Sequence, residues 1–266
     1  MMRLSEPPST PYDLRFRLFG IPVRVAMWFW IMAILLGHPF ESTPQEIVIW
    51  VAVVFVSILV HEFGHIAMAA YMKWEPERVI LYHFGGLAIS RPTYRNSYAS
   101  MAVMFGGPLA GFLFAALILL VLTLFGNFPL IGLGHYKEVA LPGDGQIIFN
   151  ANWFFIQLSY PLQSFPLLLL IFHLLAVNIL WGVLNLFPIF PLDGGQIARE
   201  LLVMSDPENG PTQAYILSIV TAVAMAVLAA VSWGSFYLMI MFLILAYMSY
   251  ENLRYQNYGG FGGDRW

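Results

Sequence analysis

The sequence predicts an all-α polytopic membrane protein with about six transmembrane helices and a small membrane-associated β-hairpin or sheet on the cytoplasmic side. Of its 266 residues, 59% are hydrophobic and only 10% are charged, whereas soluble domains carry about 25% charged residues. The apolar runs are also too long for the strands of a membrane barrel. In addition, nearly all basic residues lie in alternate segments between these runs, which is typical of helices that cross a membrane.

The composition also restricts partners and ligands. The net charge is -3 and no basic patch is interleaved with aromatic residues, so we expect no nucleic-acid partner. There is no cysteine, and any metal must therefore be held by His, Asp or Glu. Residues 1–24 contain prolines and acidic residues before the first apolar run, which is not the pattern of a cleaved signal peptide.

The expected organisation is one membrane-embedded domain over residues 14–250, between a solvated tail at 1–13 and a flexible tail at 251–266. The alternation of apolar and basic residues from Leu14 to Val25 predicts a strand pair at the membrane surface. Apolar runs predict six spans, at about 26–37, 47–72, 97–125, 166–187, 215–231 and 235–250.

Two of the connecting segments have features of their own. Residues 73–95 have an apolar centre around Gly85 and Gly86. They are expected to form either a plain surface hairpin or a hairpin with an exposed edge that dips toward the second span. Residues 126–165 are rich in Gly, Pro, Asn and aromatic residues and are expected to form a lid or interfacial loop.

The basic residues also predict the orientation. With the N-terminus inside, eleven of the twelve Lys and Arg residues fall in inner segments, and only Lys137 falls in an outer loop. Positive charge concentrates on the cytoplasmic side of membrane proteins. The sequence therefore predicts a multi-pass protein with cytoplasmic N- and C-termini, in the cell (inner) membrane of a bacterial-type cell.

The second span contains the H-E-x-x-H pattern, in His61-Glu62-Phe63-Gly64-His65. Two histidines four residues apart on a helix differ by roughly 40° in azimuth, so both can face one metal ion. Glu62 is then placed to act on a metal-bound water. Because ionisable side chains are costly at membrane depth, these residues are candidates for a functional site.

A catalytic zinc usually takes three protein ligands and keeps one position for water. Asp193 is the best candidate for the third ligand. It follows a break at Pro188 and Pro191 and precedes two glycines, so its backbone can turn back into the membrane. His83, His173 and Glu62 itself remain as alternatives.

Four motifs carry a resemblance to a known family. They are H-E-F-G-H at 61–65, F-G-G at 84–86, F-G-G-P-L-A-G at 105–111 and N-L-F-P-I-F-P-L-D-G-G at 185–195. With these motifs the chain resembles the site-2 protease family of intramembrane zinc metallopeptidases, in a compact form without PDZ or CBS domains. The resemblance covers nearly all of 14–204, whereas the last two spans match only in being apolar.

The resemblance implies one Zn²⁺ held by His61, His65 and Asp193, with Glu62 as the catalytic base and Asn185 near the scissile peptide or oxyanion. It implies an intramembrane zinc metalloendopeptidase that cuts within or near the transmembrane segments of membrane-protein substrates in the lipid bilayer. The hairpin from Val79 to Ile89 is expected to receive an unwound substrate strand by β-addition.

Two other functions are compatible with these motifs. A divalent-metal transporter would need polar residues along a path through both leaflets, and the first, fifth and sixth spans provide almost none. A catalytically inactive binding protein of the same fold would normally lack Glu62 or one of the metal ligands.

Other polar and small residues in the spans are expected to have structural roles. Asn178 is expected to make an interhelical hydrogen bond, and Gly106 and Gly107 to make a helix packing contact. His38 and His135 are expected in solvated outer loops.

Overall fold

The structure is a computed structural model that describes residues 8–37, 42–83, 85–94, 96–133, 146–150, 154–232 and 234–259. These residues are mostly helical, which confirms the predicted class. The chain divides into two compact units, one of residues 1–92 with 109–182 and the other of residues 93–108 with 183–266. The expectation of one domain over 14–250 stays a prediction.

Five helical segments are long and apolar enough to cross a membrane. They are α2 (Pro44–Tyr71), α3 (Ser97–Leu124), the continuous run Phe165–Asn185, α7 (Gly210–Val231) and most of α8 (Phe236–Gly259). The run Phe165–Asn185 consists of α4 (Phe165–Ala176), the π-helical turn η1 (Val177–Trp181) and α5 (Gly182–Asn185). The remaining predicted span, the first one at 26–37, corresponds to α1 (Met27–Leu36), which has only ten residues. At about 1.5 Å per residue it is shorter than the hydrocarbon core.

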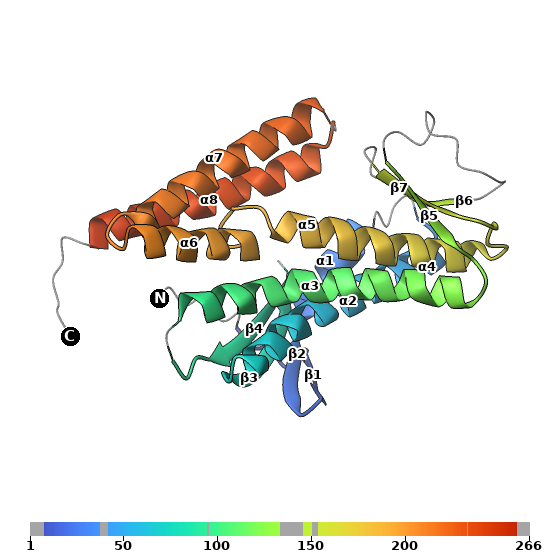
Figure 1. Cartoon of the computed structure of the whole chain (residues 1–266), viewed down its shortest axis with the longest axis horizontal. Coiled ribbons are helices and arrows are strands. Elements are labelled where there is room, and N and C mark those ends of the chain that lie inside the picture. The colour runs from blue at the N-terminus through green and yellow to red at the C-terminus, as the bar shows by residue number, and fades with distance from the viewer. Residues whose placement is uncertain are drawn as a thin grey trace. The chain divides into compact units, whose positions relative to one another are not determined.

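The first unit contains a four-stranded sheet, in the order β1 (Leu14–Leu18), β2 (Ile21–Val25), β3 (Glu75–Tyr82) and β4 (Gly85–Arg91). The β2–β3 pair is parallel and the other two pairs are antiparallel. Alternate apolar residues give the sheet one buried face, which shares a core with residues of α1 and α2. Figure 1 shows β3 and β4 alongside α2, and β4 is an edge strand, as predicted.

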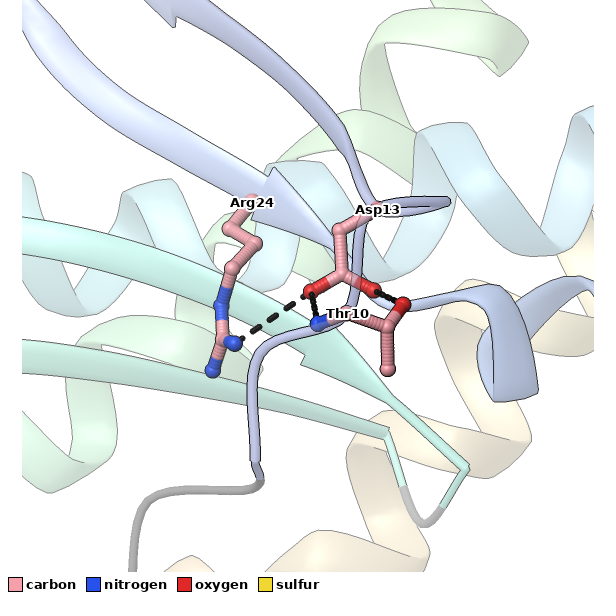
Figure 2. Close-up of polar contacts among 3 residues, drawn as sticks. All are labelled: Thr10, Asp13 and Arg24. Carbon is pink, nitrogen blue, oxygen red and sulfur yellow. Dashed lines mark hydrogen bonds and ion pairs between the residues drawn. The ribbon is translucent and has the colours of Figure 1, made fainter.

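Asp13 connects the residues before β1 to the sheet (Figure 2). Its carboxylate accepts hydrogen bonds from the Thr10 amide (3.1 Å) and hydroxyl (2.6 Å), and it lies 3.3 Å from Nη1 of Arg24. Burial raises the pKa of Asp13, but the hydrogen bonds from Thr10 and the Met27 backbone, with the charge of Arg24, outweigh it and lower the pKa. Asp13, the last residue of the expected solvated tail, therefore belongs to the folded structure.

A second sheet in the same unit occupies part of the predicted lid or interfacial loop. It consists of β5 (Pro129–Leu133), β6 (Gln146–Asn150) and β7 (Phe154–Leu158), in the order β5-β7-β6 with antiparallel pairing. The Ile, Phe and Leu residues of β6 and β7 share a core with α3 and α4, and Figure 1 shows the sheet at one end of these helices. The surrounding Gly, Pro and Asn residues suggest a loop in the sequence, but burial of these short apolar runs stabilises them as strands.

The second unit contains α6 (Asp193–Ser205), α7 and α8. Figure 1 shows α7 and α8 side by side, and small residues such as Ala222 and Ala226 pack against Phe242 in their shared core. The last helix is longer than predicted, because α8 continues through residue 251 to Gly259. Glu251 and Arg254 lie 3.9 Å apart, one turn from each other on this extension, and such pairs support a helix.

Candidate metal centre

The H-E-x-x-H residues lie on α2, where His61, Glu62 and His65 are all buried. The helix begins with a capping box, in which the Thr43 side chain accepts from the amide of Glu46 and the Glu46 carboxylate accepts from the amide of Thr43. It then continues unbroken for 28 residues. The Nε2 atoms of His61 and His65 are 3.2 Å apart. The two imidazoles therefore converge on one point, as their spacing predicts.

Strand β4 passes directly against Glu62. A Cβ atom built on Gly86 would lie only 2.3 Å from Cγ, Cδ and Oε1 of Glu62. Any side chain larger than hydrogen at this position would therefore displace the Glu62 carboxylate. Of the two hairpin arrangements that the sequence allows, the structure has the one that dips toward the second span. Phe84, which precedes the glycine pair in the motif, lies outside the described residues.

Asp193 is the first residue of α6 and is buried. The loop before it contains Pro188 and a cis peptide bond between Phe190 and Pro191. A Cβ atom on Gly194 would lie 2.2 Å from the backbone oxygen of Leu186, and one on Gly195 would lie 2.4 Å from the carbonyl carbon of Ile189. The two glycines thus allow the start of α6 to pack directly on the loop backbone, which fixes the position of Asp193.

Two serines that no sequence motif singles out contact the same loop. The Ser218 hydroxyl on α7 accepts a hydrogen bond from the Phe190 amide (3.1 Å), and the Ser249 hydroxyl on α8 lies 3.1 Å from the Phe190 carbonyl oxygen. Both serines are at most 1% exposed. A buried hydroxyl in an apolar span needs a partner. The presence of serines in apolar spans was therefore the signal that could have pointed to these contacts. It is a weak signal, because many such serines bond within their own helix, as Ser218 also does to the carbonyl oxygen of Ala214.

The other candidate residues have separate roles in the first unit. Asn178 donates from Nδ2 to the Ser57 hydroxyl on α2 (2.9 Å), which is the predicted interhelical hydrogen bond. The His173 ring packs edge-on against Trp50, with centroids 5.1 Å apart, and the His83 ring contacts Tyr82. His38 and His135 lie outside the described residues.

The remaining predicted residues belong to the second unit. Asn185 is buried at the last position of α5, close in sequence to the loop that carries Asp193. Gly106 and Gly107 are both buried on α3, in agreement with the predicted packing contact.

Among the residues that the structure describes, His61 and His65 in the first unit and Asp193 in the second are the candidate metal ligands, and each offers one ligand atom. His83 and His173 are not part of this group. Two nitrogen donors and one carboxylate suit a catalytic zinc, which keeps its fourth position for water. The chemistry of the donor set therefore fits Zn²⁺.

These features define a polytopic membrane protein with a zincin-type helix and a buried His₂Asp donor set. The model of peptidase family M50 matches residues 49–229. The chain therefore belongs to peptidase family M50, which confirms the resemblance found from the four motifs. A solved structure, the site-2 protease from Methanocaldococcus jannaschii, has the same fold. The TM-score is 0.55 with 21% identity, over 90% of this chain and 94% of that chain.

Curated relatives are similar over about 70% of this chain. Zinc metalloprotease MJ0392 from Methanocaldococcus jannaschii is 24% identical over 72% of this chain and 46% of its own length. Putative zinc metalloprotease sll0528 from Synechocystis is 25% identical, over 70% of this chain and 42% of its own length. Putative zinc metalloprotease Rip3 from Mycobacterium tuberculosis is 26% identical, over 68% of this chain and 39% of its own length. The chain thus spans less than half the length of these relatives.

Proposed function

We propose that this protein is a zinc-dependent intramembrane endopeptidase that hydrolyses peptide bonds within or near transmembrane segments of membrane-protein substrates. The observation that carries the proposal is the buried His61, Glu62 and His65 on α2, a helix apolar enough to span a membrane. Ionisable residues at this depth are rare and usually functional. Membership of a peptidase family and relatives named zinc metalloproteases support the same activity.

In this proposal His61, His65 and Asp193 hold one Zn²⁺, which when bound supplies a Lewis acid and lowers the pKa of water toward 7. Glu62 takes the proton from the attacking water and gives it to the leaving amine. The Asn185 amide donates a hydrogen bond to the substrate backbone or to the developing oxyanion. Removal of one such donor typically costs about 3 kcal/mol of transition-state stabilisation.

The proposed depth of the site follows from the bounds of α2. His61 lies ten residues before the helix ends at Tyr71, which is about 15 Å along the axis. The ion would then lie inside the bilayer, nearer the end of α2 that leads into β3. We propose that both termini and this end are cytoplasmic, because the basic residues concentrate in the segments on this side.

The substrate must unwind locally, because the peptide bonds of an intact transmembrane helix are sheltered from attack. We propose that the unwound segment pairs with β4, which is an edge strand and which passes against Glu62 at Gly86. Pairing through main-chain hydrogen bonds accepts many sequences. It would also hold an extended peptide next to the catalytic base.

Crosslinking tests this pairing, and the absence of native cysteines makes single introduced cysteines informative. Cysteines at Leu87 and Ile89, two residues apart on β4, should form disulfides with substrate cysteines that are also two residues apart. The reason is that strand pairing fixes one register. The measurement is the crosslink yield for each cysteine pair in the membrane. Yields that do not depend on position, or no crosslinks at all, would contradict pairing at this edge.

Metal removal tests the activity itself. The full-length protein in proteoliposomes should cleave a single-span reporter, and a strong chelator should abolish the cleavage. Added Zn²⁺ should restore it, because the donor set contains no soft thiolate ligand and is expected to exchange its metal reversibly. Cleavage that survives chelation would contradict a zinc peptidase. Zinc flux across the same liposomes, without cleavage, would favour the transporter instead.

The two serines that hold the Asp193 loop should affect metal retention. The double variant Ser218→Ala and Ser249→Ala removes both side-chain contacts to Phe190. We expect about tenfold weaker zinc binding, as for other residues that orient a metal ligand, measured by competition with a chelator. Thr123→Val is the matched control, since this hydroxyl donates to the Leu119 carbonyl oxygen within its own helix, α3. Equal affinity in the double variant and the wild type would show that the serines do not position Asp193.

A further inference from the structure

The outer face of the first sheet carries four arginines from three strands. On β1, Arg15 and Arg17 alternate with Phe16 and Leu18, which pack against the core. Arg15 and Arg17 therefore point to the opposite face. Arg24 on β2 is the direct cross-strand partner of Arg15, so it shares that outer face.

The fourth arginine, Arg78, lies on the neighbouring strand β3. It precedes Val79, which is fully buried in the core and pairs with Val23 of β2. Arg78 consequently projects to the same side as Arg24. All four arginines, together with Ser9, line one cleft of about 650 Å³. The cleft lies entirely within the first unit.

Two carboxylates lie near these arginines. Asp13 lies 3.3 Å from Arg24, and Glu77 lies 2.8 Å from Arg91 and 3.9 Å from Arg78. Within the part of the chain that the structure describes, Arg15 and Arg17 form no ion pair, and both are exposed. Arg15 and Arg24 lie directly opposite each other on paired strands, and like charges in this arrangement repel each other. The cleft is therefore suited to an anion.

The cleft is next to the points where apolar helices begin and end. Strand β2 ends at Val25 and α1 begins at Met27, while β3 begins at Glu75, four residues after α2 ends at Tyr71. Trp28, at the start of α1, is 54% exposed, and tryptophan is enriched at membrane interfaces. Connectivity thus places the cleft at the level of lipid headgroups rather than deep in the cytoplasm.

We propose that the four-arginine cleft binds the phosphate of an anionic phospholipid headgroup. Guanidinium groups bind phosphate oxygens in pairs with matched geometry. Basic clusters beside a membrane-spanning helix attract anionic lipids. A lipid in this cleft would hold the first sheet, including its edge strand β4, against the membrane surface. The proposal does not depend on the proposed peptidase activity.

Lipid titration of the delipidated full-length protein in neutral detergent tests this site. Native mass spectrometry would count bound phosphatidylglycerol or phosphatidylcholine, with inorganic phosphate as a third arm. We expect a Kd at least tenfold lower for phosphatidylglycerol than for phosphatidylcholine. The double variant Arg15→Gln and Arg17→Gln should raise the phosphatidylglycerol Kd about tenfold. The control, Arg199→Gln with Arg254→Gln, removes the same charge from α6 and α8 and should leave the Kd unchanged.

Three results would overturn the proposal. The first is equal affinity for the two lipids, and the second is an equal loss of affinity in the β1 variant and the control. The third is binding of inorganic phosphate with the same Kd as phosphatidylglycerol, because soluble phosphate would then be the ligand. Thermal unfolding of each variant shows whether it is folded, and both β1 arginines are exposed, so we expect unchanged unfolding temperatures.

Discussion

Replacement of Glu62 by glutamine should abolish cleavage of a single-span reporter while zinc stays bound. The amide is nearly the same size as the carboxylate, but it cannot accept the proton of the attacking water. General acid–base catalysis of this kind typically contributes 10²–10⁴-fold, so we expect kcat to fall about 10³-fold. Metal content is the second measurement, because Glu62 is not one of the three proposed ligands and its loss should leave zinc at one ion per chain.

The same helix provides a matched control. Glu46 lies in the capping box at the start of α2, and glutamine serves equally well at this position of the box. Glu46→Gln should therefore leave both kcat and zinc content unchanged. If Glu62→Gln cleaved the reporter at the wild-type rate, the assignment of the base would be wrong. If it lost zinc as well as activity, Glu62 would be acting as a ligand.

The parts of the proposed metal centre have local signals in the sequence. The spacing of His61 and His65 follows from the helical repeat alone, and the prolines and glycines around Asp193 show where a span must break. Five of the six predicted spans are long helices, because a run of about 20 apolar residues has few alternatives in lipid. The first span is the exception, since only ten residues of it form α1.

What the sequence did not reveal depends on contacts between distant residues. Strands β5 to β7 are five residues long, and their stability comes from burial against α3 and α4 rather than from a pattern of their own. Ser218 and Ser249 resemble other small residues in apolar helices until both are seen to contact Phe190. The four arginines were visible as positive-inside charges, but their shared cleft requires the strand register.

Gly86 also depends on a contact between distant residues. Its F-G-G motif is visible in the sequence, but the contact with Glu62 that requires a glycine is not. We expect Gly86→Ala to lower kcat about 10²-fold without loss of zinc. The added methyl group would lie 2.3 Å from the Glu62 side chain, so the carboxylate must move. A displacement of about 1 Å at a reacting group can cost 10²-fold in rate. Reporter cleavage and metal content are again the measurements.

Gly111→Ala is the matched control for this change. A Cβ atom there would make ordinary contacts, with the backbone oxygen of Asn178 at 3.4 Å as its nearest neighbour. We therefore expect normal cleavage from this variant. If Gly86→Ala also cleaved the reporter normally, Glu62 would tolerate displacement. If Gly86→Ala lost its zinc, the substitution would have disturbed more than the Glu62 carboxylate.

A double-mutant comparison separates a local effect on Glu62 from a general disturbance of β4. If Gly86→Ala acts through the Glu62 carboxylate, then adding it to Glu62→Gln should slow the residual cleavage no further. Residues that act as one catalytic unit are strongly non-additive in this way. If the two losses multiply instead, Gly86 acts through another route, such as the pairing of substrate with the β4 edge. The crosslinking yields at Leu87 and Ile89 would then fall in the Gly86→Ala background, whereas an effect confined to Glu62 leaves them unchanged.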